Sequence, residues 1–231
     1  MNAALSLHTA SAASGLALDR IGRGLADPVH GAQQVFRQLL SAQSHPGRLH
    51  TLPDTLLQGL EAPGLGRAMA AVLLSLLDAE TGLWLPADWQ DSGAADWLRF
   101  HTGTRTDLTL ADAPFAATDL AALAREGRDA ASLWTTLPWG SDEVPQDGAT
   151  LLLEVPALAD ADAKVGADAL TLRGPGIAST QTLAVAGLDA AFWRARDAVA
   201  AAYPCGVDLL LCCGDTFAAI PRTTRITRQE G

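Results

Sequence analysis

The stretch YPCGVDLLLCCGDTFAAIPRTTRI, residues 203–226, decides the fold expected of this chain. Residues 207–213 form an almost unbroken apolar run, interrupted only by Asp208, and its length suits a strand buried on both faces. A second apolar run follows at residues 216–220, after the two-residue step Gly214-Asp215. Such a step is typical of a hairpin turn, because glycine readily takes the positive φ that these turns need. The sequence therefore predicts a hydrophobic hairpin around which the other core elements pack.

A small group of arginines follows the second strand of this hairpin. Pro221 cannot donate to a β-ladder and ends the strand, and Arg222, Arg225 and Arg228 come after it. Together with Thr223-Thr224, they combine guanidinium groups with hydroxyls, a combination that suits phosphate. A polar, solvated strand end is the alternative interpretation of the same residues.

Length and composition restrict the class of protein. A chain of 231 residues is long enough for one large domain or two small ones with a substantial core. No stretch approaches the roughly 18 consecutive apolar residues of a membrane span, which predicts a soluble globular protein. The net charge of −10 argues against a broad nucleic-acid surface, although one local arginine cluster can still hold an anionic ligand.

The cysteines and histidines indicate neither a disulfide framework nor a metal site. Cys205, Cys212 and Cys213 are odd in number and crowded into one apolar segment, where they suit small core positions better than a redox or metal role. The five histidines include no metal-type pair on a helix, so we expect no metal. Residues 1–26 lack the pattern of a signal peptide and are expected to form a weakly ordered arm in a cytoplasmic protein.

The remaining elements are expected from capping residues and hydrophobic periodicity. The first helix begins at Asp27-Pro28, with an apolar stripe of Val29, Ala32, Val35, Phe36, Leu39 and Leu40, and ends near Ala42. The other predicted helices are 64–78, 94–101 with Ser92 as a possible cap, 119–125 with Thr118 as cap, and 188–202. Extended segments are predicted at 48–52, 83–85, 149–155 and 169–173, with a loop at 134–147. Helices first and interleaved strands later predict a mixed α/β fold.

Common catalytic motifs are absent, and two weaker anion-binding patterns remain. No dinucleotide-binding, phosphate-loop or nucleophile-elbow motif occurs in the sequence. Arg99 and His101 lie near a helix C-terminus, where they can bind an anion or simply complement the helix dipole. Arg173 ends a strand before residues 174–176 (Gly-Pro-Gly), whose backbone N–H groups can cradle an anion or form a plain turn. The six tryptophans are scattered and are interpreted as core or interface residues.

Five segments carry a more specific signal. They are VHGAQQVFRQLLSAQSHPGRLHTL (29–52), LRFHTGT (98–104), GATLLLEV (148–155), LTLRGPGIAST (170–180) and the opening stretch. In type and order they resemble the PhnH family, a subunit of the bacterial carbon–phosphorus lyase system. The similarity covers about residues 27–226, which predicts a single domain there and a short C-terminal tail at 227–231.

The resemblance implies a function in phosphonate breakdown. Members work beside PhnG, PhnI and PhnJ in a core complex, in which an alkylphosphonate displaces adenine from ATP to give ribose 1-phosphonate 5-triphosphate. PhnI is credited with the displacement and PhnJ with the radical step, which leaves an accessory role here. The family is dimeric. The resemblance implies an α/β fold of three layers, helix–sheet–helix, with a mixed central sheet. That fold resembles the large domain of pyridoxal-phosphate-dependent transferases, without the cofactor.

Two functional hypotheses therefore stand. In the first, the chain is an accessory subunit whose exposed hydrophobic and tryptophan-bearing surface binds a second copy and the partner subunits. In the second, it is a stand-alone binding module for ATP or alkylphosphonate, with Arg99, His101, Arg173 and Arg222 as anion contacts. Independent catalysis is disfavoured because the motifs supply no nucleophile–base pair. No cofactor is expected, since Lys164 is the only lysine available for a Schiff base and lies in an acidic linker outside the matching segments.

Overall fold

The computed structural model describes residues 21–160 and 168–228. Residues 1–20 of the expected arm lie outside this range, as does Lys164. The remainder of that arm lies against the domain, because Leu25 is buried and the Trp97 Nε1–H donates to the Gly22 carbonyl at 2.9 Å.

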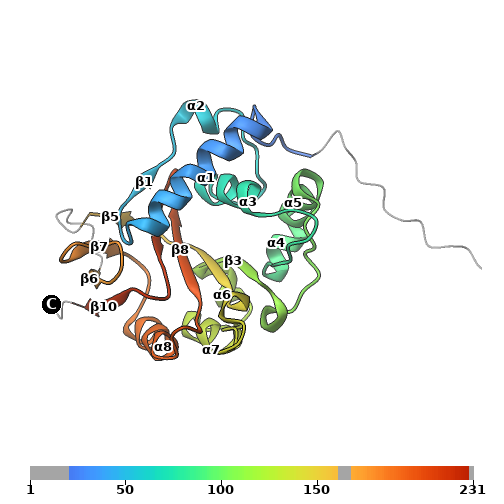
Figure 1. Cartoon of the computed structure of the whole chain (residues 1–231). Helices are drawn as coiled ribbons and strands as arrows, with labels where there is room; N and C mark the ends of the chain where they lie inside the picture. The colour runs from blue at the N-terminus through green and yellow to red at the C-terminus, as the bar shows by residue number, and fades with distance from the viewer. Residues whose placement is uncertain (1–20, 161–167, 229–231) are drawn as a thin grey trace, which may run out of the picture.

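A mixed six-stranded sheet forms the centre of the molecule (Figure 1). In spatial order its strands are β1 (His50–Thr51), β9 (Thr216–Ile220), β8 (Asp208–Cys213), β4 (Thr150–Glu154), β3 (Phe115–Asp119) and β2 (Leu83–Trp84). β8, β4, β3 and β2 run parallel, while β9 is antiparallel to both of its neighbours. The predicted mixed α/β fold with a mixed sheet is confirmed.

The predicted hairpin is β8 and β9, joined at Gly214-Asp215. Gly214 has φ 58°, the left-handed conformation that the turn requires. β8 lies between β4 and β9, and Leu209 to Cys212 are all buried, as expected for a central strand. Burial raises the pKa of the Cys212 thiol well above its ordinary value, so Cys212 acts as a small core residue.

Alternate residues of the central strands face two separate cores. On one face, Leu152, Leu210 and Phe217 pack with buried side chains of the helices α1 (Pro28–Ser44), α2 (Asp54–Leu57), α3 (Arg67–Leu76), α4 (Ala87–Asp91) and α5 (Ala94–Thr102). On the other face, Leu151 and Leu209 pack with α7 (Leu133–Thr136) and α8 (Ala190–Ala200). α6 (Leu120–Arg125) contributes to both cores. Figure 1 shows the sheet between these two groups of helices.

A second, antiparallel sheet was not predicted. Its order is β10 (Arg225–Arg228), β6 (Asp168–Arg173), β7 (Gln181–Val185) and β5 (Leu158–Ala159). Leu170, Leu172 and Leu183 bury one of its faces in the core that also holds α8. β10 extends to Arg228, so it crosses the boundary expected between the domain and the C-terminal tail at residues 226 and 227.

Several local expectations are corrected. On α1, Val35, Leu39 and Ala42 face the core, whereas Val29, Phe36 and Leu40 of the expected stripe lie on a neighbouring, exposed side. α3 begins at Arg67, three residues later than expected. Ser92 does not cap α5: its hydroxyl donates to the Trp89 carbonyl, and the residue before the helix is Gly93. Thr118 belongs to β3, and the carboxylate of Asp119 caps α6 by accepting from the Ala122 N–H. The expected loop at 134–147 includes most of α7 and the 3₁₀ turn η4 (Pro145–Asp147).

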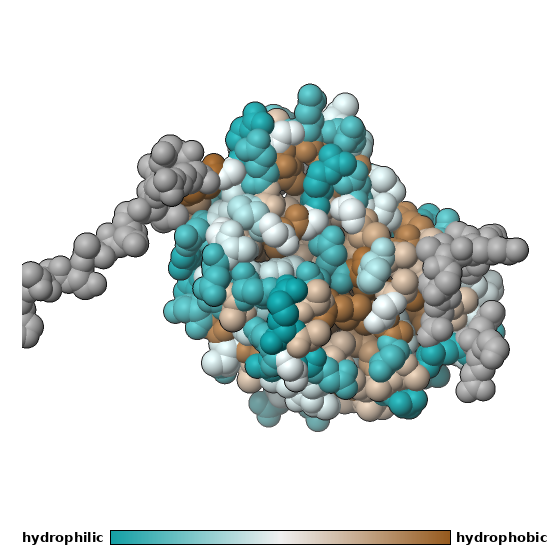
Figure 2. Space-filling view, turned by 180° about the vertical axis from the view of Figure 1, so that it is seen from behind, coloured by the Kyte–Doolittle hydropathy of each residue, from teal (hydrophilic) through white to brown (hydrophobic). Residues whose placement is uncertain are grey.

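The interpretation of the tryptophans as core residues is confirmed for five of them, and the prediction of a tryptophan-bearing surface is wrong. Trp84, Trp89, Trp97, Trp134 and Trp193 are all buried inside the chain. The exposed large hydrophobic side chains are instead Val29, Phe36, Leu40, Phe100, Val144 and Tyr203. Figure 2 shows a largely hydrophilic face with a brown patch on the side of the molecule that carries the second sheet. No helix in the described ranges is both long and apolar enough to cross a membrane.

Candidate functional site

A cavity of about 560 Å³ lies where the two sheets and the end of α8 meet. Its wall consists of residues 173–175 from the end of β6, residues 200 and 203 from the end of α8, and residues 222–225 between β9 and β10. These segments are far apart in the sequence. The Arg-Gly-Pro turn and the Pro-Arg-Thr-Thr-Arg run, each a weak anion-binding pattern alone, thus form one site.

Two arginines at the edge of this cavity occupy directly opposite positions on neighbouring strands. β6 and β10 pair antiparallel with Arg173 directly opposite Arg225, and both side chains are exposed. Neither guanidinium has a hydrogen bond or ion pair to another residue of the described ranges. Like charges directly opposite in a sheet destabilise the pair, so packing alone does not account for this arrangement.

Arg222 is held in place by Asp208, at the start of β8. Its Nε and Nη2 donate to Asp208 Oδ2 at 3.2 and 2.7 Å, and its backbone N–H donates to Oδ1 at 2.7 Å. Its Nη1 and Nη2 also donate to the carbonyls of Pro145 and Gly148, at 2.6 and 3.3 Å. Arg222 therefore ties the hairpin to the segment before β4, with its charge already neutralised.

Arg196 of α8 fixes the same segment from behind. The side chain is 1% exposed, and its Nη2 donates to the Pro221 carbonyl at 2.9 Å while its Nη1 donates to the Thr224 carbonyl. Burial lowers the pKa of Arg196 below its ordinary value, since a buried guanidinium has lost its hydration. Thr224 is also buried, and its hydroxyl has no hydrogen-bond partner among the described residues.

Glycine is required where the wall segments approach each other. Gly174 has φ 151°, and a Cβ there would lie 3.1 Å from the Thr223 carbonyl oxygen. A Cβ at Gly148 would lie 2.6 Å from Arg222 Nη1. A larger residue at 174 would therefore press on the backbone that carries Arg225, and one at 148 would displace the Arg222 guanidinium.

Arg99 and His101 lie elsewhere. Both belong to α5, where Arg99 pairs with Asp96. The His101 ring is 3.0 Å from the Gly22 carbonyl through Nε2, and it lines a cavity of about 390 Å³ whose wall includes residues 21–26. The structure therefore brings Arg173 and Arg222 together and separates them from Arg99 and His101.

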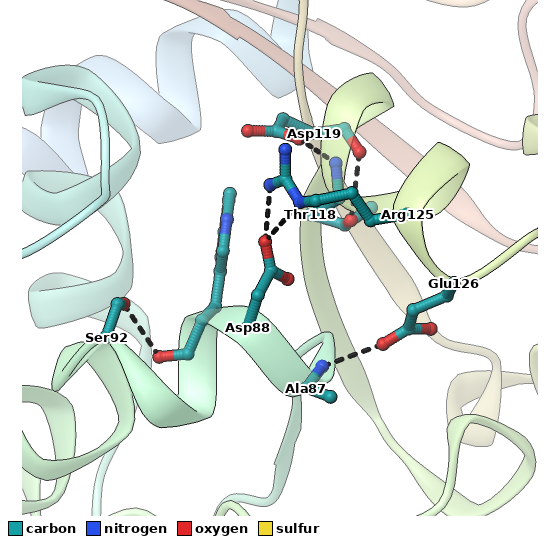
Figure 3. A network of polar contacts seen from close by, with 9 residues as sticks. Ala87, Asp88, Ser92, Thr118, Asp119, Arg125 and Glu126 are labelled. Carbon is teal, nitrogen blue, oxygen red and sulfur yellow. Dashed lines mark hydrogen bonds and ion pairs between the residues drawn. The ribbon is translucent and has the colours of Figure 1, made fainter.

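A polar network connects α4 with α6 (Figure 3). Arg125 points toward Asp88, with its Nε 2.8 Å from Oδ2, and the Glu126 carboxylate accepts from the Ala87 N–H at 2.7 Å. These contacts join two helices and are accounted for by structure alone. At the end of β4, the Glu154 carboxylate accepts from the Gly66 N–H at 3.1 Å, and burial raises the pKa of Glu154. The described residues contain no group of His, Cys, Asp or Glu side chains arranged to hold a metal ion.

Comparisons with known proteins agree on one family along nearly the whole chain. Residues 23–227 match the family described as bacterial phosphonate metabolism protein (PhnH). The chain belongs to the PhnH family. It is 35% identical over 207 residues to the alpha-D-ribose 1-methylphosphonate 5-triphosphate synthase subunit PhnH of Rhizobium meliloti (strain 1021), covering 88% of this chain and 94% of that protein. It is 34% identical over 194 residues to HtxG of Stutzerimonas stutzeri, a protein named as a C-P lyase subunit, covering 84% and 85%.

Three of the segments by which the PhnH resemblance was identified lie against one another, and two of them line the cavity. A Cβ at Gly176 would lie 2.1 Å from the Ser44 carbonyl oxygen at the end of α1, and the Gly47 N–H donates to the Ala219 carbonyl at 2.9 Å. The PhnH-like Ser-x-Pro-Gly, Arg-Gly-Pro-Gly and Pro-Arg-Thr-Thr segments thus support one another. The Leu-Arg-Phe-His-Thr segment, on α5, serves the opposite core.

Sequence reasoning missed two residues that shape this site and the pairing of a third. Arg225 is part of the run that suits phosphate, but its pairing opposite Arg173 depends on β10, which was not predicted. Arg196 lies on the buried face of α8 with Phe192, Trp193 and Val199, and that helical spacing was a usable signal. Asp208 interrupts an apolar strand, but only the structure shows its partner.

Proposed function

We propose that this chain is an accessory subunit of an alpha-D-ribose 1-methylphosphonate 5-triphosphate synthase, acting with PhnG and PhnI when an alkylphosphonate displaces adenine from ATP, with PhnJ as a further partner. The observation that carries the proposal is the character of the cavity beside the family's signature segments. Its polar side chains are arginines and hydroxyls, with no carboxylate or imidazole among them. Such a wall suits binding and charge stabilisation better than proton transfer.

The outer face of α1 supports assembly with partners. Val29, Phe36 and Leu40 share one exposed side of this helix, with exposed fractions of 62%, 41% and 50%. Side chains of this kind on a helix face commonly lie in protein interfaces. We therefore propose that α1 contributes to contacts with a second copy of the chain or with another subunit.

Co-expression with PhnG, PhnI and PhnJ tests the proposal. The complex recovered through a tag on this chain would be weighed by native mass spectrometry and assayed for release of adenine from ATP in the presence of methylphosphonate. We expect all partners in the complex, and adenine release that requires this chain. A monomer that remains separate from every partner, or adenine release that is unchanged without it, would reject the accessory role.

A stand-alone binding module is the second candidate, favoured by the unneutralised pair Arg173 and Arg225. The two functions differ in their dependence on the partners. A stand-alone module would bind ATP or methylphosphonate with the same affinity whether or not the other subunits were present, whereas an accessory subunit would alter the activity of the complex.

We further propose a cytoplasmic protein with a fold related to the large domain of pyridoxal-phosphate-dependent transferases, which does not use that cofactor. The mixed sheet with helices on both faces supports the fold relationship. The single lysine of the chain, Lys164, is the sole candidate for an internal aldimine. A visible absorbance band on adding pyridoxal phosphate, lost in Lys164→Ala, would contradict the proposal that the protein does not use this cofactor.

A further inference from the structure

We propose that the cavity at Arg173 and Arg225 binds the tetrahedral oxyanion of a small organic phosphate or phosphonate. This inference deepens the proposed function and rests on it for the identity of the physiological ligand. The site itself is argued from charge, order and shape. Its test on the isolated full chain is independent of complex assembly.

The positive charge at the cavity edge favours the binding of an anion. Arg173 and Arg225 are direct cross-strand partners, which places their Cβ atoms about 5 Å apart in a typical antiparallel pair. The carboxylate of Asp208 is already engaged by Arg222, and neither exposed guanidinium is paired within the described residues. The negative end of the α8 dipole lies near residue 200 and favours one nearby cation, but it does not account for two opposed ones. A tetrahedral oxyanion between them would receive charge-assisted hydrogen bonds from both.

The segment that carries Arg225 is ordered before any ligand arrives. The Thr224 N–H donates to the Pro221 carbonyl at 2.9 Å, and buried Arg196 donates to the carbonyls of both residues. Asp208 holds Arg222 at the start of the same turn. Because the backbone before Arg225 is fixed, binding does not have to order that segment, and the remaining entropy cost falls on the two exposed side chains.

Size and lining favour a small organic ligand over an inorganic ion alone. A cavity of about 560 Å³ lies within the usual range for small-molecule sites. Beside the arginines, its wall includes Pro175, Ala200 and Tyr203, whose side chain is largely exposed at the end of α8. These residues offer apolar contact to an alkyl, sugar or base substituent while the arginines hold the oxyanion.

Calorimetric titration of the full chain tests the site directly. Inorganic phosphate, methylphosphonate, ATP and adenosine would each be added at constant ionic strength, so that general screening does not change. We expect saturable binding of at least one phosphorus compound at one site per chain, and no binding of adenosine. The ratio of the ATP and methylphosphonate affinities then distinguishes a phosphate ester from a phosphonate as the ligand source.

Matched variants locate the binding. Arg173→Gln and Arg225→Gln keep a polar side chain but remove its charge and its guanidinium, and each is expected to weaken binding roughly tenfold or more. Arg173→Lys is expected to recover part of the affinity. Arg105→Gln is the control, because Arg105 is exposed and lies between α5 and β3, outside the cavity. Far-ultraviolet circular dichroism would verify that every variant remains folded.

Two results would overturn the inference. One is no binding of phosphate, methylphosphonate or ATP by the folded wild-type chain at millimolar concentration. The other is an equal loss of affinity in the Arg105→Gln control, which would mean diffuse electrostatic attraction. If the arginine variants failed to join PhnG, PhnI and PhnJ while the wild-type chain bound no phosphorus compound, the cavity would be a docking site for protein carboxylates. In that case the accessory function would stand and the ligand site would not.

Discussion

Arg173 of β6 lies directly opposite Arg225 of β10, the edge strand of the second sheet. This relationship joins two signature segments of the family that are about fifty residues apart in the chain. Cross-strand pairs of opposite charge stabilise a sheet, and pairs of like charge weaken it. The protein therefore keeps an arrangement that costs stability in the free chain, as functional sites often do.

Charge reversal at one of these positions measures that cost. In Arg225→Glu, the repulsion with Arg173 becomes an attraction, so we expect the free energy of unfolding in urea to rise by about 0.5–1 kcal/mol. Arg105→Glu introduces the same charge change on the surface and should give no such gain. Equal effects of the two substitutions would show that repulsion between Arg173 and Arg225 is negligible.

Arg222 is expected to matter for stability rather than for binding. Its side chain is 14% exposed, and Arg222→Ala would remove the guanidinium donors from Asp208 Oδ2 and from the carbonyls of Pro145 and Gly148, leaving only the backbone N–H of residue 222 on Asp208. We expect a loss of about 2 kcal/mol in unfolding free energy, below the roughly 3–5 kcal/mol of a fully buried pair, because both partners keep some solvent contact. A double-mutant cycle with Asp208→Ala should give a coupling energy of at least about 1 kcal/mol. Arg173→Ala, lacking such partners, should change stability by less than about 0.5 kcal/mol.

Two buried threonines provide a matched comparison of a paired and an unpaired hydroxyl. Thr224 Oγ1 has no partner within the described residues, whereas the Thr104 hydroxyl donates to the Thr81 carbonyl at 2.8 Å. Valine keeps the shape of threonine but cannot form a hydrogen bond. Thr224→Val should therefore leave the unfolding free energy unchanged or raise it by up to about 1 kcal/mol, while Thr104→Val should lower it by about 1–2 kcal/mol. The reverse order in thermal denaturation would show that the Thr224 hydroxyl is satisfied in solution.

The parts of the fold that sequence reasoning predicted are those with strong local signals. The β8–β9 hairpin combined an apolar run with a turn step, and α1 combined an N-cap with a proline. β3 was missed because its Ala116 and Ala117 have helical propensity, and only burial in the sheet makes them extended. β10 was missed because its short sequence Arg-Ile-Thr-Arg has one apolar residue and two charges, which an unpaired tail would match equally well.

The candidate site was half predictable for a similar reason. Arg173 and Arg222 each stand in a turn signal, so both were found, but their shared location depends on packing between two sheets. Arg99 and His101 gave an equally good local pattern on α5, and no local signal distinguished them from the pair at the cavity. Sequence identifies residues suited to anions, whereas tertiary structure decides which of them converge.

The pH dependence of stability is expected to carry a contribution from Glu154 at the end of β4. Burial raises the pKa of this carboxyl above its ordinary value of 4.5, and the nearby Asp119 raises it further, against hydrogen bonds from the backbones of Gly66 and Gly214. Between the ordinary and the raised value, the native state binds more protons than the unfolded state. This contribution to stability is therefore fully present below about pH 4.5 and is lost as pH rises through the native pKa.

Glu154→Gln tests this, because the amide oxygen can still accept from the Gly66 N–H while the titration is removed. Urea unfolding at a series of pH values from about 4 to 8 should show the variant gaining stability relative to wild type as pH rises. Glu61→Gln is the control of opposite sign, since hydrogen bonding from Arg23 lowers the pKa of Glu61, so the contribution of Glu61 is lost as pH falls. A constant difference between Glu154→Gln and wild type over this range would mean that the Glu154 carboxyl titrates alike in both states.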